Sequence, residues 1–237
     1  MPKAKLRKPK KTIWLSLLIA IAAVIGLMSV RSKIEDARDS KMPEQTVVNL
    51  TAPSFIKGKT LMAALKDRRT GRNYDTKRLS LEDLSGILWA ANGLNRPDED
   101  KHTAPTARNV QNMDLYAFTP DGVYLYNAKA NKLVRIKETD ERAKTAVQDF
   151  AKTAPLNIVI VATYGKMQNA PMEHEKAMAL MGAGYISQNI YLYAAAFDLE
   201  TVARAMIDKQ ALKEVLNLNE NQEALLAHSV GYPREEN

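Results

Sequence analysis

The chain has 237 residues, of which 46% are hydrophobic and 26% charged, a composition typical of a globular protein. It contains no cysteine, which excludes disulfides, thiolate metal sites, iron–sulfur clusters and cysteine nucleophiles. The formal net charge is +7, but six cations lie within the first 12 positions, and the remainder carries 28 Lys+Arg against 27 Asp+Glu. That remainder has no surplus for a large basic surface, so no nucleic-acid partner is expected.

An uncharged apolar run, residues 13–30, follows the basic tail. As a helix it would span about 27 Å, close to the roughly 30 Å of a bilayer's hydrocarbon core. Two interpretations stay open: an uncleaved membrane anchor, or a signal peptide cleaved after a small-residue site near 20–22. Both leave the cations in the cytoplasm. We expect a membrane-anchored protein whose domain is exported to the periplasmic or extracytoplasmic side, or a secreted one if the leader is cleaved.

Three regions are therefore expected: the basic and apolar segment 1–30, a mixed-charge stalk over 31–57, and a folded domain over 58–237. Apolar spacing and capping residues predict helices over 61–65, 81–92, 139–153, 172–197 and 208–216. Runs rich in β-branched and aromatic residues predict strands over 114–118, 122–126, 133–136, 156–164 and 224–230. This order indicates an α+β fold, with a central mixed or antiparallel sheet flanked by helices. The segment 114–136 is either part of that sheet or a surface insertion.

The long helix predicted over 172–197 contains Gly182 and Gly184, which favour close helix packing, including packing against a partner subunit. We expect its buried face to include the following side chains: Met178, Met181, Ile186, Ile190 and Leu192.

No metal site is expected. The three histidines, His102, His174 and His228, are far apart and form no metal-binding pair. The sequence also lacks a G-x-S-x-G nucleophile elbow and a Gly-rich phosphate loop.

The most informative cluster is Arg68-Arg69-Thr70-Gly71-Arg72-Asn73-Tyr74, the opening motif. It places three guanidinium groups within five residues, with a hydroxyl between them. Guanidinium groups bind phosphate oxygens through paired, charge-assisted hydrogen bonds. By itself, however, such a cluster is more typical of a solvated basic turn.

Four further segments follow in a fixed order, and they decide between these interpretations. They are the run 87–97 (ILWAANGLNRP), the middle motif 105–111 (PTARNVQ), the pair 188–192 (QNIYL) and 198–202 (DLETV), and the ending 231–233 (GYP). Together with the opening motif, this order resembles the FMN-dependent nitroreductase family, in particular the branch of the SagB-type azoline dehydrogenases. The resemblance covers about residues 58–234.

The resemblance implies a homodimer with FMN at the subunit interface and the long helix 172–197 in that interface. Arg68 and Thr70, with Arg69 beside them, would meet the phosphate and ribityl chain. Arg72 would lie at the pyrimidine edge of the flavin, where a cation favours the charge acquired on reduction.

Three polar residues of the middle motif, Thr106, Asn109 and Gln111, would reach the flavin from the other subunit. A backbone N–H at about Ala205, flanked by Ala203 and Met206, would face flavin N5. Arg234 would complete the phosphate site.

The resemblance implies an oxidoreductase that transfers hydride through flavin N5 between a donor and a small electron-poor or oxidisable organic substrate. NAD(P)H is the donor in a cytoplasmic relative, whereas an exported enzyme would need another donor or a substrate that is itself oxidised. The alternative is a membrane-tethered, non-catalytic flavin-binding or accessory protein. No catalytic acid or base is identified. Four residues are candidates by chemistry alone, namely Lys166, Tyr185, Tyr191 and Tyr193, and core packing is the favoured role of the three tyrosines.

Overall fold

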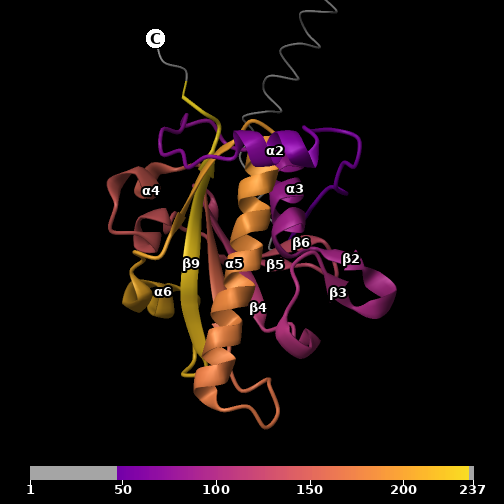
Figure 1. Ribbon diagram of the computed structural model, residues 1–237. Coiled ribbons are helices and arrows are strands. Elements are labelled where there is room, and N and C mark those ends of the chain that lie inside the picture. The colour runs from indigo at the N-terminus through magenta and orange to yellow at the C-terminus, as the bar shows by residue number, and fades with distance from the viewer. Residues whose placement is uncertain (1–46, 235–237) are drawn as a thin grey trace, which may run out of the picture. The chain divides into compact units, whose positions relative to one another are not determined.

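A seven-stranded antiparallel sheet organises residues 47–234, which are the residues that the computed structural model describes (Figure 1). Its strand order is β1-β6-β5-β4-β7-β9-β8. The strands are β1 (Val47–Asn49), β4 (Met113–Thr119), β5 (Gly122–Asn127), β6 (Lys132–Lys137), β7 (Leu156–Thr163), β8 (Glu200–Arg204) and β9 (Gln222–Gly231). A separate two-stranded ribbon joins β2 (Leu94–Arg96) to β3 (Lys101–His102).

Strand β7 lies inside the sheet and is apolar on both faces, so it contributes to two cores. Ile158 and Ile160 belong to the core under the long helix, whereas Val159 and Val161 belong to the core on the opposite face. Side chains of a strand alternate between the two faces of its sheet, which explains why the middle of β7, from Ile158 to Ala162, has no polar residue.

Helices cover both faces of the sheet. On one face α5 (Met172–Ala196) packs on β8 and β9, and α2 (Leu61–Asp67) and α3 (Leu81–Asn92) pack against α5. On the opposite face α6 (Lys209–Leu216) packs on β9 (Figure 1). Side-chain caps begin α2 and α3: the Thr60 oxygen accepts the Ala63 N–H, and the Ser80 oxygen accepts the Asp83 N–H. The remaining elements are α4 (Asp149–Thr153) and three short 3₁₀ turns, η1 (Pro97–Glu99), η2 (Ala107–Asn109) and η3 (Arg142–Thr145).

Several predicted elements differ from the structure. The helix predicted over 139–153 is divided into η3 and α4, because the Thr145 carbonyl accepts a bond from the Arg204 side chain. Strand β8 was not predicted, since its sequence ETVAR lacks a run of apolar residues. The 114–136 segment is part of the sheet and not a surface insertion, and β1, within the predicted stalk, pairs with β6.

The outer face of α5 carries exposed apolar side chains. Ile186 and Ile190 are buried as predicted. In contrast, the exposed fraction is 50% for Met181 and 60% for Leu180. Met181 lies on the helix face turned away from the sheet, so one chain alone does not bury it, and its burial against a partner subunit stays a prediction.

The expected membrane segment, residues 13–30, lies outside the described residues. Among helices within 47–234, none combines the length and the apolar character needed to cross a bilayer.

Candidate functional site

The opening motif leaves α2 and runs along the edge strand β8. The Gly71 N–H donates to the Thr201 carbonyl at 3.0 Å, and the Asn73 N–H donates to the Glu200 carboxylate at 3.3 Å. A side chain at position 71 would overlap that carboxylate. The glycine is thus required by the close approach of the loop to Glu200, not by its backbone dihedral angles.

The three arginines of the motif have different environments. Arg69 pairs with Glu200 at 3.4 Å and is 77% exposed. The guanidinium of Arg68 lies over the Tyr191 ring at 5.2 Å, and that of Arg72 over the Phe150 ring at 6.0 Å. Neither has an ion-pair partner within residues 47–234. Arg68 and Arg72 are therefore the cations that remain available to an anionic ligand.

Tyr191, on α5, joins the opening motif to β8. Its hydroxyl accepts the Ala203 N–H at 2.9 Å and shares a hydrogen bond of 3.1 Å with the Thr70 hydroxyl. Its ring packs edge-on against His228. From the sequence, Tyr191 is part of the 188–192 motif and a candidate acid or base, whereas its contacts make it a positioning residue.

The outer edge of β8 presents its backbone groups to this region. The Thr201 carbonyl and the Ala203 N–H are already paired, with Gly71 and Tyr191. The exposed Ala205 follows directly after Arg204, the last residue of β8, at a bend in the chain. It lies next to these paired positions along the chain, and its role beside flavin N5 stays a prediction. Ala203 supplies its N–H to Tyr191 instead.

The C-terminal segment closes the same region. The Arg234 N–H donates to the Asn73 carbonyl at 3.1 Å, and Tyr74 pairs with Pro233 as an isolated β-bridge. The Tyr232 hydroxyl donates to Asp83 at 2.6 Å and accepts the Ser80 N–H, so it braces the start of α3. The predicted residue Arg234 is therefore brought next to the opening motif.

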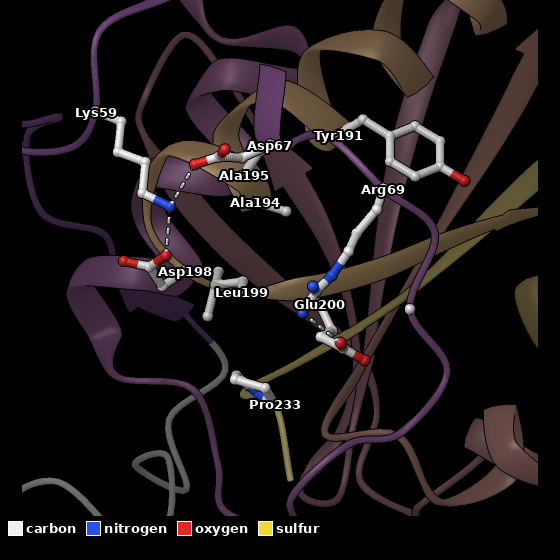
Figure 2. A pocket seen from close by; sticks show the side chains of 11 residues that line it. Lys59, Asp67, Arg69, Tyr191, Ala194, Ala195, Asp198, Leu199, Glu200 and Pro233 are labelled. Carbon is white, nitrogen blue, oxygen red and sulfur yellow. Dashed lines mark hydrogen bonds and ion pairs between the residues drawn. The ribbon is translucent and has the colours of Figure 1, made fainter. Parts of the chain in front are cut away.

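A hollow of about 300 Å³ lies between the opening motif and α5 (Figure 2). Figure 2 shows Lys59 held between Asp67 and Asp198, at 3.0 and 2.6 Å, and Arg69 directed at Glu200. Both cations in this hollow already face carboxylates. A phosphate would meet negative charge here, so the hollow itself is a poor phosphate site. Arg68 and Arg72, which lie in the opening motif beside it, are better placed to bind a phosphate.

The middle motif forms a tight loop in which Arg108, Asn109 and Gln111 all have positive φ angles near 50°. The Thr106 hydroxyl accepts the Gln111 N–H at 3.2 Å, and the Gln111 amide donates to Asn109 at 2.7 Å. The Gln111 Oε1 atom is buried and has no hydrogen-bond partner in the described part of the chain. This orphaned acceptor is available to a donor from outside the loop.

The two predicted halves of the site are not in contact within one chain. Thr106 lines a hollow of about 250 Å³ with Met181 and Tyr185, whereas the opening motif lies beside Tyr191. Met181 and Tyr191 are ten residues apart on α5, about 15 Å along the helix axis. The structure thus brings together Arg68, Arg69, Thr70, Arg72, Ala203, Ala205 and Arg234, and leaves Thr106, Asn109 and Gln111 elsewhere.

Three other candidate residues, Lys166, Tyr193 and His228, make contacts that hold the fold together. Lys166 donates to the Gln111 carbonyl at 3.3 Å, and Tyr193 stacks on Phe197 at 4.3 Å. His228 is fully buried between Ser187 and Thr201, and this burial lowers its pKa to about 3. Residues 47–234 contain no cluster of three His, Asp or Glu side chains that could hold a metal ion.

Comparison with known proteins identifies the fold and the motifs together. The profile that represents the nitroreductase family matches residues 65–232. The chain belongs to the nitroreductase family. A nitroreductase family relative from Methanocaldococcus jannaschii, assigned as a nitroreductase, is 29% identical over 163 residues, which cover 65% of this chain and 82% of the relative.

Solved structures of nitroreductase-like proteins superimpose on this family member. A protein from Ralstonia eutropha, assigned as a nitroreductase, is 33% identical with a TM-score of 0.77, covering 84% of this chain and 95% of that one. A protein from Anabaena variabilis, similarly assigned, is 18% identical with a TM-score of 0.68, covering 83% of this chain and 43% of that one, and supports the fold alone.

Proposed function

We propose that this nitroreductase family member is an FMN-dependent oxidoreductase acting on a small electron-poor or oxidisable organic molecule. The observation that carries the proposal is a set of cations beside a strand edge that have no counter-ion among residues 47–234. Arg68 and Arg72 stack on aromatic rings instead of pairing with acids, and the backbone of Arg234 is hydrogen-bonded beside them. They lie next to the edge strand β8, which ends at Arg204, directly before Ala205.

The chemistry of the donor set fits FMN. A phosphate needs charged donors, which Arg68 and Arg234 supply, and a hydroxyl donor, which Thr70 supplies. A flavin ring needs hydrogen-bonding groups on its polar edge, and the orphaned Gln111 Oε1 acceptor offers one. Bound FMN would supply two-electron hydride acceptance and donation at its N5 atom.

Each residue has a separate task in this proposal. Arg68 and Arg234 bind the phosphate, and Thr70 binds the ribityl side of the ligand. Arg72 holds a positive charge at the polar edge of the ring. Tyr191 fixes the distance between Thr70 and β8, so that the two sides of the site do not move independently.

The proposal includes a homodimer, because one chain keeps the two halves of the site apart. The exposed apolar residues of α5 offer the surface for it: Leu180 is 60% exposed, Met181 50% and Tyr185 44%. Apolar side chains gathered on one exposed helix face are typical of a subunit interface. A partner packed there would place its middle motif, with Thr106, Asn109 and Gln111, beside this chain's opening motif.

The electron donor depends on where the domain is located. We propose that residues 13–30 anchor the chain and that the domain is exported, as the basic tail before the apolar run favours. NAD(P)H would be the donor of a domain facing the cytoplasm. An exported domain requires another donor, or a substrate that is itself oxidised, as in the SagB-type branch whose motif run resembles residues 87–97.

The test is the visible absorption spectrum of the full-length chain purified in detergent, with released cofactor identified by chromatography. A flavin spectrum with about one FMN per chain, bleached anaerobically by a hydride donor, is the expected result. A colourless chain that also fails to bind added FMN would contradict the proposal and favour the non-catalytic accessory protein.

A further inference from the structure

A guanidinium group is buried directly behind the β8 edge. Arg204 is the last residue of β8, immediately before the exposed Ala205, and is only 3% exposed. Its Nε donates to Ser229 Oγ at 3.1 Å, and its Nη1 to the Thr145 carbonyl at 2.9 Å. Its Nη2 donates to Asn157 Oδ1 at 3.0 Å and to Thr145 Oγ1 at 3.4 Å.

All of these acceptors are neutral, and residues 47–234 place no carboxylate within ion-pair distance of Arg204. Burial lowers the pKa of Arg204 to about 10, so the group still carries its charge at neutral pH. The two ionisable groups that interact with it, Tyr74 and His228, are uncharged there, because burial raises the pKa of the first and lowers the pKa of the second. Within the described part of the chain, Arg204 is therefore a fixed positive charge without a counter-ion.

Burying such a charge carries a large desolvation penalty, and an apolar side chain would fill the same strand position without that penalty. The location of Arg204 beside the opening motif indicates a functional reason for this buried charge. Val202, two residues earlier on the same face of β8, packs with Tyr74 and Phe150, the ring that carries Arg72. Arg204 thus lies beneath the opening motif, on the opposite face of β8 from Tyr191.

We propose that Arg204 is a positioning residue whose buried positive charge favours the reduced, more negative state of a flavin bound at the β8 edge. The proposal rests on the proposed function, because it assumes that FMN occupies this edge. It does not require Arg204 to touch the ligand: a charge held in a low-dielectric interior acts over several ångströms.

The experiment compares the full-length chain in detergent with Arg204→Gln and Arg204→Lys. FMN is the probe. Fluorescence titration gives the affinity for oxidised FMN, and equilibration with a reference dye gives the midpoint potential of bound FMN. We expect Arg204→Gln to lower the preference for reduced over oxidised FMN about tenfold, which lowers a two-electron potential by about 30 mV. Arg204→Lys, which keeps the charge, should stay within about threefold of the wild type.

A second variant covers the case in which Arg204→Gln does not fold. Asn157→Asp places a carboxylate against the guanidinium, in a side chain of nearly the same shape. It should lower the preference for reduced FMN by a similar factor, although it also loses the Asn157 bond to the Ala151 carbonyl.

The outcomes separate the two proposals. A wild-type chain that binds no FMN overturns the proposed function and this role together. A wild-type chain that binds FMN, with an unchanged potential in flavin-loaded Arg204→Gln or Asn157→Asp, overturns only the role of Arg204. Equal shifts in Arg204→Gln and Arg204→Lys would reduce Arg204 to a structural hydrogen-bond donor and overturn it as well.

Discussion

The hydroxyl of Tyr191 accepts the backbone N–H of Ala203 at 2.9 Å, and this bond connects the long helix α5 to the edge strand β8. The same hydroxyl meets Thr70 of the opening motif. One side-chain oxygen therefore joins three segments that are separate in the sequence. Its removal should affect the site more than the fold.

Tyr191→Phe should lower FMN affinity several-fold and cost about 1–2 kcal/mol of unfolding free energy, because the Ala203 N–H loses its acceptor. FMN titration and urea unfolding measure the two effects. Tyr126→Phe is the matched control: the Tyr126 hydroxyl is buried without a hydrogen-bond partner among the described residues, so its removal should be neutral or stabilising. Equal behaviour of the two variants would refute the positioning role of Tyr191.

Gly71→Ala should move the opening motif away from β8, because the added methyl overlaps the Glu200 carboxylate. We expect at least a tenfold loss of FMN affinity and about 1–3 kcal/mol of destabilisation. The double variant with Glu200→Ala removes the clash, so the effect of Gly71→Ala should be smaller in that background. Strictly additive effects in this double-mutant cycle would argue against the contact.

Arg68→Ala and Arg69→Ala should differ, although the residues are adjacent. Arg68 has no carboxylate partner in the described residues and should bind the phosphate, so its loss should weaken FMN binding about 10–100-fold. Arg69 is exposed and paired with Glu200, and we expect a change of less than about threefold. Titrations at low and high salt measure both; a larger effect for Arg69 would reverse the assignment.

Arg72→Ala should slow reduction of bound flavin while leaving stability nearly unchanged, because Arg72 is exposed and its ring contact with Phe150 is at 6.0 Å. Anaerobic stopped-flow absorbance follows the reduction, and thermal unfolding follows the fold. Comparable losses in both measurements would count against its placement at the flavin.

Glu175 should make stability depend on acid pH. Burial opposes ionisation of its carboxyl, but N–H bonds from Gly165, Met167 and Lys166 together lower its pKa below the ordinary value of 4.5. A lowered folded-state pKa stabilises the protein above pH 4.5, and this contribution is lost as the pH falls through the folded-state pKa.

Glu175→Gln should therefore cost about 1–3 kcal/mol at neutral pH and lose less stability on acidification. Urea unfolding at a series of pH values measures this. The exposed neighbour Glu173→Gln is the control and should follow the wild-type curve. An unaltered pH profile in Glu175→Gln would show that another group is responsible.

Local pattern was sufficient for the elements with strong periodicity. The buried strand predicted over 156–164 is β7 (Leu156–Thr163), and the helix predicted over 172–197 is α5 (Met172–Ala196). The opening motif was also identified as a cation cluster from its residues alone. Each of these features depends on neighbours within one or two turns of chain, which the sequence contains directly.

The arrangement of the site depends on contacts across long separations. Glu200 forms an ion pair with Arg69, which is 131 residues away in the sequence, so Arg69 is no longer free to bind an anion. Tyr191 forms a hydrogen bond with Thr70 across a separation of 121 residues. Arg204 looks like an ordinary charged residue in the sequence, and only the packing of β7, β9 and η3 around it makes it a buried charge. Sequence therefore determined which groups are present and which family pattern they follow. Folding determined which cations are already neutralised, because ion pairing and desolvation depend on distance in space and not on distance along the chain.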